Sequence, residues 1–529
     1  MINSTTDGRS SQPDDQPNIV LVMADQMTAF ALSMYGNTVT QTPNLDQLAS
    51  SGTVFQNAYC NYPLCAPARF SLMSGRLPSR IGAYDNAAEL PASIPTIAHY
   101  LRDAGYYTCL AGKMHFVGPD QHHGMEDRLT TEIYPADFSW TPPETYAAMS
   151  TSGLADDEEV PLGVSSVETI TDAAPVSRSL QMDYDDEVIH RACQHLYDRK
   201  RYGDGRPLFM TVSFTQPHDP YVSRREFWDL YEDEDIDDPR VPPIPLKQMD
   251  PHSQSLFHHY SLHKFDVTQD IYRRARHGYY AMISDVDNKL GLLRTALADC
   301  GMTDNTIVIF TSDHGDMLGE RGLWFKKTLY EPAIRIPMIM SWPGRTTPAK
   351  IQAPCSLVDL LPTIVEMATG STDSLLTEAD GESLVDLFST DMPERAVKSE
   401  HIDGGTIAPR VMLRKGTMKM VYSEEYPMQL FNLEDDPGEL NDLAATSEWK
   451  QTRDSLLQEI EATWDLGRLK QQVIENQRVR QMLLRSLNKG RTQSWEHYPN
   501  PAETSTRWVR AGDRFPEVEQ RGYLRYPAE

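Results

Sequence analysis

The sequence predicts an α/β fold built on a large, mostly parallel sheet. Four continuous apolar runs of six to eight residues are typical of strands that are buried on both faces. Polar residues follow each run at once, at the position where open α/β sheets hold their ligands. If the strands are parallel neighbours, these polar groups converge on one edge of the sheet. The predicted strands span 17–24, 106–111, 207–214 and 306–312.

Side chains that can bind ligands or move protons stand at all four strand ends. A single strand followed by such polar residues is expected by chance, but four of them are not expected from chance packing. The pattern therefore indicates a single site shared by the strands. In chain order, the residues are Asp25 and Gln26, Lys113 and His115, His218, and Asp313 and His314.

A cysteine near the first strand strengthens this prediction. A short strand over 52–59 leads to Cys65, and Pro67 suits the first turn of a helix that Gly75 can end. Cys65 then lies at the positive end of the helix dipole, where an anion is favoured. Arg69 projects from the same helix face and can hold an oxyanion with two hydrogen bonds. Alone, such a motif more often marks a buried cysteine beside an ordinary helix.

Helices are predicted between the strands, over 97–104, 184–200 and 271–298. Residues 116–180 are rich in proline, aspartate and serine and show weak periodicity. We interpret that segment as a lid or specificity insert within a catalytic domain that spans 17–400.

The remaining chain divides into three further parts. Residues 1–16 are polar and predict a disordered tail. A hairpin over 411–422 and a strand over 429–433 predict a small antiparallel domain at 401–447. Residues 448–529 form a helical and then extended tail, whose aromatic side chains predict docking on a neighbouring subunit in a homo-oligomer, a dimer or tetramer.

Composition excludes several classes of function. The net charge of −27 argues against nucleic acid and anionic membranes as partners, so an anionic substrate needs a local positive site. No apolar run of about eighteen residues appears, and no secretory signal opens the sequence. Six scattered cysteines without C-x-x-C spacing predict reduced thiols and a cytoplasmic protein.

The residue types at the strand ends predict specific chemistry. Two carboxylates and an amide suit a hard cation such as Ca²⁺, whereas an imidazole favours Mn²⁺. We therefore predict one divalent cation, held by Asp25, Gln26, Asp313 and His314. Lys113 and Lys326 are candidate anion-binding groups, and His115 and His218 are candidate acids or bases. Taken singly, Lys326 could instead belong to a solvated pair, and His218 could cap a loop.

These residues carry a resemblance to a known family. Residues 65–69 (CAPAR) match the signature of type I sulfatases, and residues 105–115 resemble the second signature of that family. Asp25, Asp313-His314-Gly315 and residues 322–326 fall where the family has its metal and lysine residues. The resemblance covers nearly the whole chain. It implies an alkaline-phosphatase-like sandwich with a small C-terminal antiparallel sheet and an extended tail.

The resemblance also implies a mechanism. Cys65 would be oxidised to formylglycine by a formylglycine-generating enzyme, and would also contact the metal. One hydroxyl of the hydrated aldehyde would attack the sulfur of a small anionic sulfate ester, and the other would allow sulfate to be expelled. Arg69 would support the diol, and Lys113 and Lys326 would bind sulfate oxygens. His218 would assist the leaving alcohol, and His115 would accept a proton from the second hydroxyl.

Within the family, the chain most resembles choline-sulfatases. The supporting stretches are Asp25-Gln26, residues 406–414, the tail around Trp495, and residues 82–86 and 137–142. A choline head group requires aromatic faces and a counter-charge, and the residues predicted to bind it are Asn86, Trp140 and Glu400. Residues 143–180 depart from that subgroup because they are small, acidic and hydroxylic.

Three other functions remain open from the sequence. The same scaffold resembles arylsulfatases and phosphonate monoester hydrolases or phosphodiesterases, which share the formylglycine. A third hypothesis is an acidic metal-binding protein with a relic site, in which Cys65 remains a thiol. The first two differ from choline-sulfatase in substrate and the third in having no activity.

Overall fold

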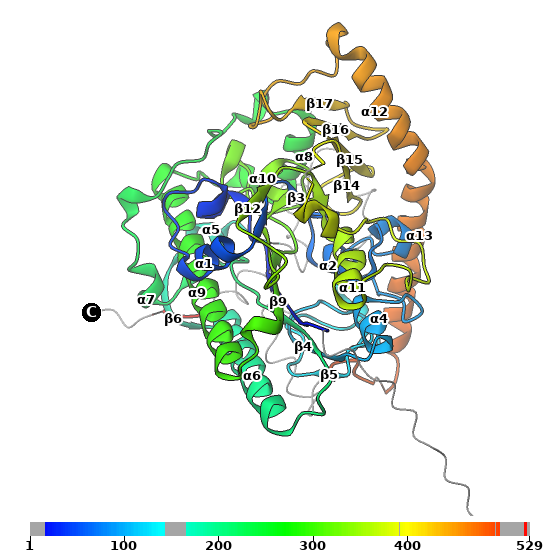
Figure 1. Ribbon diagram of the computed structural model, residues 1–529. Coiled ribbons are helices and arrows are strands. Elements are labelled where there is room, and N and C mark those ends of the chain that lie inside the picture. The colour runs from blue at the N-terminus through cyan, green and yellow to red at the C-terminus, as the bar shows by residue number, and fades with distance from the viewer. Residues whose placement is uncertain (1–15, 143–164, 391, 492, 498–522, 526–529) are drawn as a thin grey trace, which may run out of the picture.

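The computed structural model describes residues 16–142, 165–390, 392–491, 493–497 and 523–525. Its main sheet contains the four predicted strands as parallel neighbours in the order β9-β1-β7-β4. The prediction of a shared parallel sheet is therefore confirmed (Figure 1). The observed bounds are β1 Asn18–Ala24, β4 Tyr107–Gly112, β7 Leu208–Ser213 and β9 Thr306–Ser312.

Four shorter strands complete this sheet. β5 (Asp127–Arg128) extends it in parallel beyond β4. Beyond β9 come β11 (Met338–Ser341), which is antiparallel to β9, then β2 (Thr53–Phe55) and β12 (Ala349–Ile351). The sheet is thus mixed at one side and parallel through its centre.

The prediction of one strand over 52–59 is wrong. The chain leaves the main sheet after β2, and β3 (Ala58–Tyr59) pairs instead with β10 (Arg335–Ile336) and β13 (Cys355–Ser356). This change of partner depends on segments almost 300 residues further along the chain, so local pattern could not reveal it.

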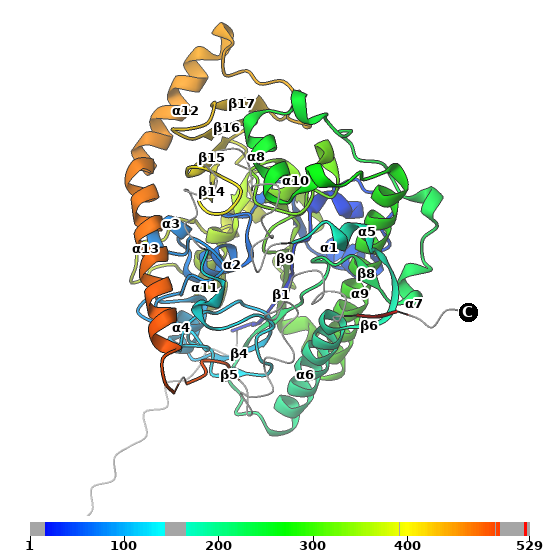
Figure 2. The ribbon, with the colours of Figure 1, turned by 180° about the vertical axis from the view of Figure 1, so that it is seen from behind.

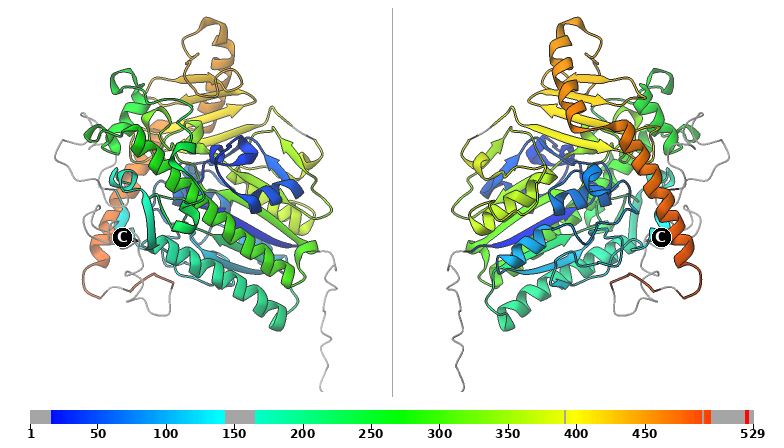
Figure 3. Two further views of the ribbon diagram at one scale, coloured as in Figure 1. Left: turned by 90° about the vertical axis from the view of Figure 1, so that its left-hand side faces the viewer. Right: turned by 90° about the vertical axis from the view of Figure 1, so that its right-hand side faces the viewer.

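Helices cover both faces of the sheet, and alternate residues of β1 show why its sequence is apolar throughout. Val20 and Val22 pack into one core and Ile19 and Leu21 into the other. The two views in Figure 3 look onto these opposite sides. On the first side lie α1 Pro43–Ser51, α6 Leu180–Tyr202 and α9 Gln269–Asp299; on the second lie α2 Cys65–Ser74, α4 Ile97–Asp103 and α11 Leu360–Thr369.

Short elements decorate this frame. A three-stranded sheet joins β6 (Ala174–Ser179), β8 (Val222–Ser223) and the C-terminal β18 (Tyr523–Arg525). β5, α5 and β6 all lie within 116–180, so part of the predicted insert is regular structure, while its residues 143–164 are outside the described part. The short helices are α3 Pro78–Ile81, α5 Glu168–Thr171, α7 Arg225–Trp228, α8 Pro251–His259 and α10 Glu331–Ile334.

The C-terminal region forms the predicted small antiparallel sheet. Its order is β14-β15-β16-β17, and it begins five residues before the predicted boundary at 401. The predicted hairpin over 411–422 corresponds to β15 and β16. The bounds are β14 Ala396–His401, β15 Arg410–Lys415, β16 Met418–Tyr422 and β17 Gln429–Asn432.

Two helices follow that sheet. α12 (Lys450–Thr463) and α13 (Leu466–Leu487) are separated at Trp464, whose backbone is extended, and the Asp465 side chain caps α13. α13 descends along the outside of the molecule from the small sheet toward β5 (Figure 2). Beyond it, the Trp495 ring packs edge-on against Phe138 of the same chain, with ring centroids 5.2 Å apart. The predicted oligomer therefore stays a prediction.

Two findings bear on the chemical environment. All six cysteines are free thiols. Among the described residues, no helix combines the length and apolar character needed to cross a membrane.

Candidate active site

Cys65 is the first residue of α2, as its sequence context predicts. Leu64 is extended, Pro67 lies in the first turn, and Gly75 ends the helix with a φ of 66°. Every residue of α2 is buried, so the helix is a rigid support for the Cys65 side chain. The positive end of the helix dipole lies at Cys65 and favours negative charge there.

The four strand ends meet at this helix start. The Cys65 sulfur lies 3.7 Å from Asp25 Oδ1, after β1, and 3.4 Å from His314 Nε2, after β9. It also accepts a hydrogen bond from Lys326 Nζ at 3.3 Å. The structure thus brings the ends of β1 and β9 together with Lys326 at Cys65.

Four ligand atoms form a candidate metal centre. The donors of Asp25, Cys65, Asp313 and His314 lie within 4.8 Å of one another, and all four residues are buried. A buried set of two carboxylates and an imidazole, with donor atoms this close together, fits a divalent cation. Gln26 is adjacent, but its Oε1 accepts from Lys326 Nζ at 2.8 Å, and its backbone N–H donates to Asp313 Oδ1 at 3.0 Å.

Three cations surround the same point. Arg69 bonds Asp313 through Nε at 2.9 Å, and it also bonds the Ser213 hydroxyl at 2.8 Å. Lys113 forms an ion pair with Asp25 and lies 4.3 Å from the centroid of the Tyr134 ring. With Lys326, they place three cations beside Asp25, Asp313 and Cys65 in a chain of net charge −27. Such a site attracts an anionic substrate.

These charges act on the thiol. Burial alone would raise the pKa of Cys65, but Lys113, Lys326 and His314 hold the pKa well below its usual value. Burial likewise opposes ionisation of Asp25, yet Lys113 and Arg69 contribute to keeping the pKa of that carboxyl low. The side chain at position 65 is therefore held in an environment that stabilises negative charge.

Two histidines lie on different sides of this centre. The His218 Nε2 atom lies 2.6 Å from Lys326 Nζ, and its Nδ1 lies 3.1 Å from Asp219 Oδ1. The His115 ring packs against Tyr134, with centroids 4.8 Å apart, and burial lowers its pKa. Both predicted proton-transfer residues thus belong to the cluster.

The predicted substrate-binding residues divide into two groups. Asn86 Oδ1 accepts the backbone N–H of Ala66 at 3.0 Å, beside Cys65. The half-buried Trp140 ring lies edge-on to His115, with centroids 5.8 Å apart. Glu400 instead accepts the Ser79 backbone N–H at 2.8 Å and Trp464 Nε1 at 2.6 Å. None of the described contacts of Glu400 joins it to the cluster around Cys65.

Asp316 is a residue that the sequence reasoning missed. Its Oδ2 accepts from Gln26 Nε2 at 2.7 Å and from the Tyr221 hydroxyl at 2.7 Å. Its Oδ1 accepts the backbone N–H of Phe325 at 3.0 Å, where φ is 62°. Asp316 therefore fixes which way the Gln26 amide points and stabilises the turn that carries Lys326. The sequence feature that could have identified Asp316 is its position two residues after His314.

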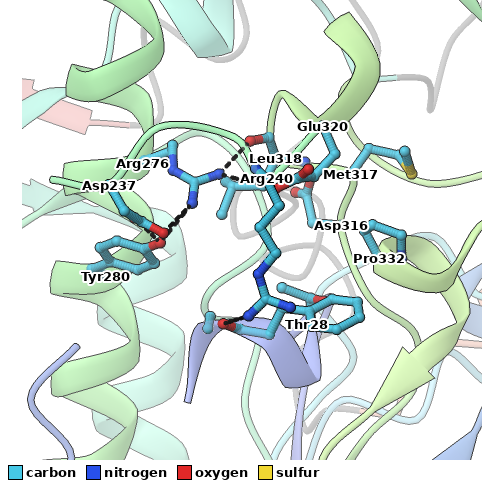
Figure 4. A pocket seen from close by; sticks show the side chains of 12 residues that line it. Thr28, Asp237, Arg240, Arg276, Tyr280, Asp316, Met317, Leu318, Glu320 and Pro332 are labelled. Carbon is cyan, nitrogen blue, oxygen red and sulfur yellow. Dashed lines mark hydrogen bonds and ion pairs between the residues drawn. The ribbon is translucent and has the colours of Figure 1, made fainter. Parts of the chain in front are cut away.

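A small polar cavity lies behind Asp316 (Figure 4). Its volume is about 20 Å³, enough for about one water molecule. Arg276 forms part of its lining and donates to the Leu318 carbonyl at 3.0 Å and to Asp237 at 2.7 Å. The bond to Leu318 holds the segment that follows Asp316.

Comparisons with known proteins agree with this geometry. The profile of the Sulfatase family matches residues 17–371, and that of the N-sulphoglucosamine sulphohydrolase C-terminal region matches residues 319–465. The chain belongs to the sulfatase family. It is accordingly an enzyme that hydrolyses sulfate esters, and the family generally uses a formylglycine and a divalent metal.

Individual relatives sharpen the comparison. This sulfatase is 42% identical to a choline-sulfatase of Rhizobium meliloti over 518 residues, which covers 97% of this chain and 99% of the relative. It is 28% identical to an arylsulfatase of Clostridium perfringens, over 83% of this chain and 93% of that one. A solved phosphonate monoester hydrolase of Agrobacterium radiobacter matches with a TM-score of 0.66 and 21% identity, over 87% of this chain and 96% of that one. That last likeness shows the shared fold.

Proposed function

We propose that this sulfatase hydrolyses choline-O-sulfate to choline and sulfate, with Cys65 oxidised to formylglycine. The observation that carries the chemistry is the meeting of Cys65, three cations and the candidate metal centre at one sheet edge. The near full-length identity of 42% to a choline-sulfatase supports the substrate. A formylglycine-generating enzyme is then the partner that matures the chain, and we infer that both act in the cytoplasm.

The metal-binding residues would be Asp25, Asp313 and His314, with the side chain at position 65 and Gln26 as neighbours. A bound divalent cation supplies positive charge that polarises oxygen atoms at the reacting centre. The oxygen donors favour Ca²⁺, and the imidazole of His314 favours Mn²⁺. We propose Ca²⁺ first.

The cations of the chain bind the sulfate group. Lys113 and Lys326 approach position 65 from two sides, because one bonds Asp25 and the other bonds both Gln26 and the Cys65 sulfur. Arg69 is fixed by Asp313 and Ser213 and supports the charge that develops beside α2. Preorganised charges of this kind stabilise a transition state without further reorganisation.

The two histidines move protons. Choline is an alkyl alcohol, so its oxygen requires a proton as the ester bond breaks. His218 is placed to donate that proton, since Asp219 holds Nδ1 and Lys326 lies beside Nε2. His115 is placed to accept a proton on the other side, where its lowered pKa favours the neutral ring.

The alcohol half of the ester would lie against two segments, 82–86 and 137–142, which we call the pocket wall. They carry Asn86 and Trp140, and the Trp140 ring lies beside Tyr134, with centroids 4.8 Å apart. Aromatic faces attract a quaternary ammonium group through cation–π interaction. Glu400, which the sequence assigned to the same role, stays a prediction.

A second candidate is a phosphonate monoester or phosphodiester hydrolase. The solved phosphonate monoester hydrolase shares the fold, and a centre with three cations can bind phosphorus as well as sulfur oxyanions. An arylsulfatase would use the same centre with a different wall. Relative rates on matched esters separate these three activities.

The deciding experiment compares choline-O-sulfate, 4-nitrophenyl sulfate and a phenylphosphonate ester on one purified sample. The mass of the Cys65 peptide is measured first, so that the fraction carrying formylglycine is known. We expect the highest kcat/KM for choline-O-sulfate. A fully converted sample that releases no sulfate from it would overturn the choline assignment, and faster phosphonate cleavage would favour the second candidate.

A further inference from the structure

The C-terminal helix α13 reaches both segments of the pocket wall through one buried side chain, Arg480. We propose that Arg480 is a positioning residue that sets the affinity of the pocket for the alcohol half of the ester. This inference rests on the proposed function, because it concerns the same pocket. Arg480 itself lies behind the wall and acts through the residues that it holds.

The first connection is a fork of hydrogen bonds to Asp85. Arg480 donates through NH1 to Asp85 Oδ1 at 2.7 Å and through NH2 to Oδ2 at 2.6 Å. Gln477, one turn earlier, donates to the same carboxylate at 3.2 Å. Arg480 and Asp85 are 4% and 1% exposed, so this ion pair is shielded from solvent. The two parallel bonds fix orientation as well as distance.

The consequence falls on Asn86, the next residue. Its Oδ1 accepts the N–H of Ala66 at the start of α2, directly beside Cys65. The Asp85 carboxylate also accepts the backbone N–H of Ala87 at 2.9 Å. Because Arg480 binds this carboxylate, it also helps to set the shape of the turn that carries Asn86. One segment of the wall is therefore oriented from α13.

The second connection reaches the segment that carries Trp140. Arg480 NH1 lies 3.5 Å from the Thr141 hydroxyl. The next helix residue, Gln481, donates to the Pro142 carbonyl at 2.8 Å. These contacts hold the chain immediately after Trp140, whose ring lies against Tyr134 and His115. A single guanidinium thus bridges the two segments of the pocket wall.

The way in which α13 packs onto the protein supports a positioning role for Arg480. Its first half is anchored by apolar packing, with Leu469 and Val473 in a buried cluster. Near Arg480 the apolar side chains turn outward instead, because Val479 and Met482 are 47% and 49% exposed. The second half of α13 therefore contacts the body of the protein through directional polar bonds, which specify positions more sharply than apolar contact does.

The test uses variants that avoid leaving one buried charge alone, since this is strongly destabilising. The pair Asp85→Asn with Arg480→Met removes both charges together. Arg480→Lys keeps the charge but cannot form the two-pronged bond. Arg478→Met, an exposed arginine on the same helix, is the matched control.

For the double variant, we expect KM for choline-O-sulfate to rise about tenfold, with kcat changed less than about threefold. For 4-nitrophenyl sulfate we expect both constants to stay within about threefold, because its flat alcohol relies less on the wall. Arg480→Lys should retain thermal stability better than the double variant without restoring KM. Arg478→Met should match the unaltered enzyme.

Hydrogen exchange provides a readout that does not depend on substrate. We expect faster exchange in peptides covering 82–90 and 134–142, and unchanged exchange in α2 beyond its first turn. Equal losses of activity on both esters with an unchanged KM, or unaltered exchange in both peptides, would overturn the proposal. If the unaltered enzyme cleaves only 4-nitrophenyl sulfate, the choline assignment fails while the exchange result still decides the role of Arg480.

Discussion

The centre around Cys65 and the pocket wall are built in different ways. Most residues of the centre follow strand ends or lie in the first turns of α2, and Lys326 lies in a buried turn. The wall consists of connecting segments that are held from outside by α13. In the proposed function, the reaction takes place at the sheet edge, and substrate choice depends on segments that α13 supports.

This difference has a practical meaning for mutations. Changes at the centre should affect every sulfate ester, because all of them share the sulfate group. Changes at the wall should discriminate among alcohols. The largest expected effects therefore come from the centre, and the smallest come from the support of the wall.

Replacement of Cys65 by alanine gives the largest predicted loss. It removes the group on which the attack depends, so kcat should fall by at least about 10³-fold on all sulfate esters. Sulfate release and thermal unfolding are measured together. Cys193→Ala, on α6 and away from the cluster, is the control and should retain activity. Retention of activity in Cys65→Ala would refute the role of this residue.

Replacement of His218 by asparagine should depend on the leaving alcohol. A proton donor contributes about 10²–10⁴-fold when the leaving group is poor, so kcat for choline-O-sulfate should fall within that range. For 4-nitrophenyl sulfate, whose phenolate leaves without a proton, the loss should be under about tenfold. The exposed His190→Asn is the control. Equal losses on the two esters would assign His218 to another step.

Metal removal tests the donor set. Treatment with a chelator should abolish activity, and re-addition of Ca²⁺ or Mn²⁺ to the stripped enzyme measures which ion restores it. His314→Asn replaces a nitrogen donor with an amide oxygen, so the ratio of activity with Ca²⁺ to that with Mn²⁺ should rise about tenfold. An unchanged ratio would show that His314 does not choose the ion.

Much of the centre could be predicted from sequence because its signals are local. Each apolar run and the polar residues after it are adjacent in the chain, so Asp25, Lys113 and His218 needed no knowledge of distant contacts. Because the carboxyl ends of parallel strands lie at one edge of the sheet in any strand order, these residues were expected to lie close together. The Cys65 helix carried its own start and stop signals in Pro67 and Gly75.

The supporting residues could not be predicted in this way. Asp85 and Arg480 are 395 residues apart in the chain, and neither stands out beside its neighbours. Asp316 lay within a recognised motif, yet its bond to Gln26 depends on a partner 290 residues earlier. The short strand over 52–59 was wrong for the same reason, since each half takes a different distant partner. Local sequence pattern identifies the type of a helix or strand, whereas the residues that it contacts and holds in place depend on the tertiary structure.

Glu400 connects α3 with the junction between α12 and α13. The sequence placed it in the pocket, whereas the structure bonds it to Ser79 and to Trp464 at the junction of α12 and α13. Burial raises the pKa of this carboxyl to about 7, even though the bonds from Ser79 and Trp464 favour its charged form. Its proton is therefore linked to the folding of the segment that supports α13.

The sign of that linkage gives a prediction about the stability of the fold rather than about activity. A carboxyl with a raised folded pKa stabilises the fold fully below its usual pKa of 4.5, and this stability is lost as pH rises toward about 7. The loss amounts to about 3 kcal/mol at most. In Glu400→Gln this component disappears, so the urea midpoint should fall less between pH 4.5 and 7 than in the unaltered enzyme. The exposed Glu475→Gln on α13 is the control, and parallel curves for all three proteins would show that Glu400 does not couple protonation to the support of the wall.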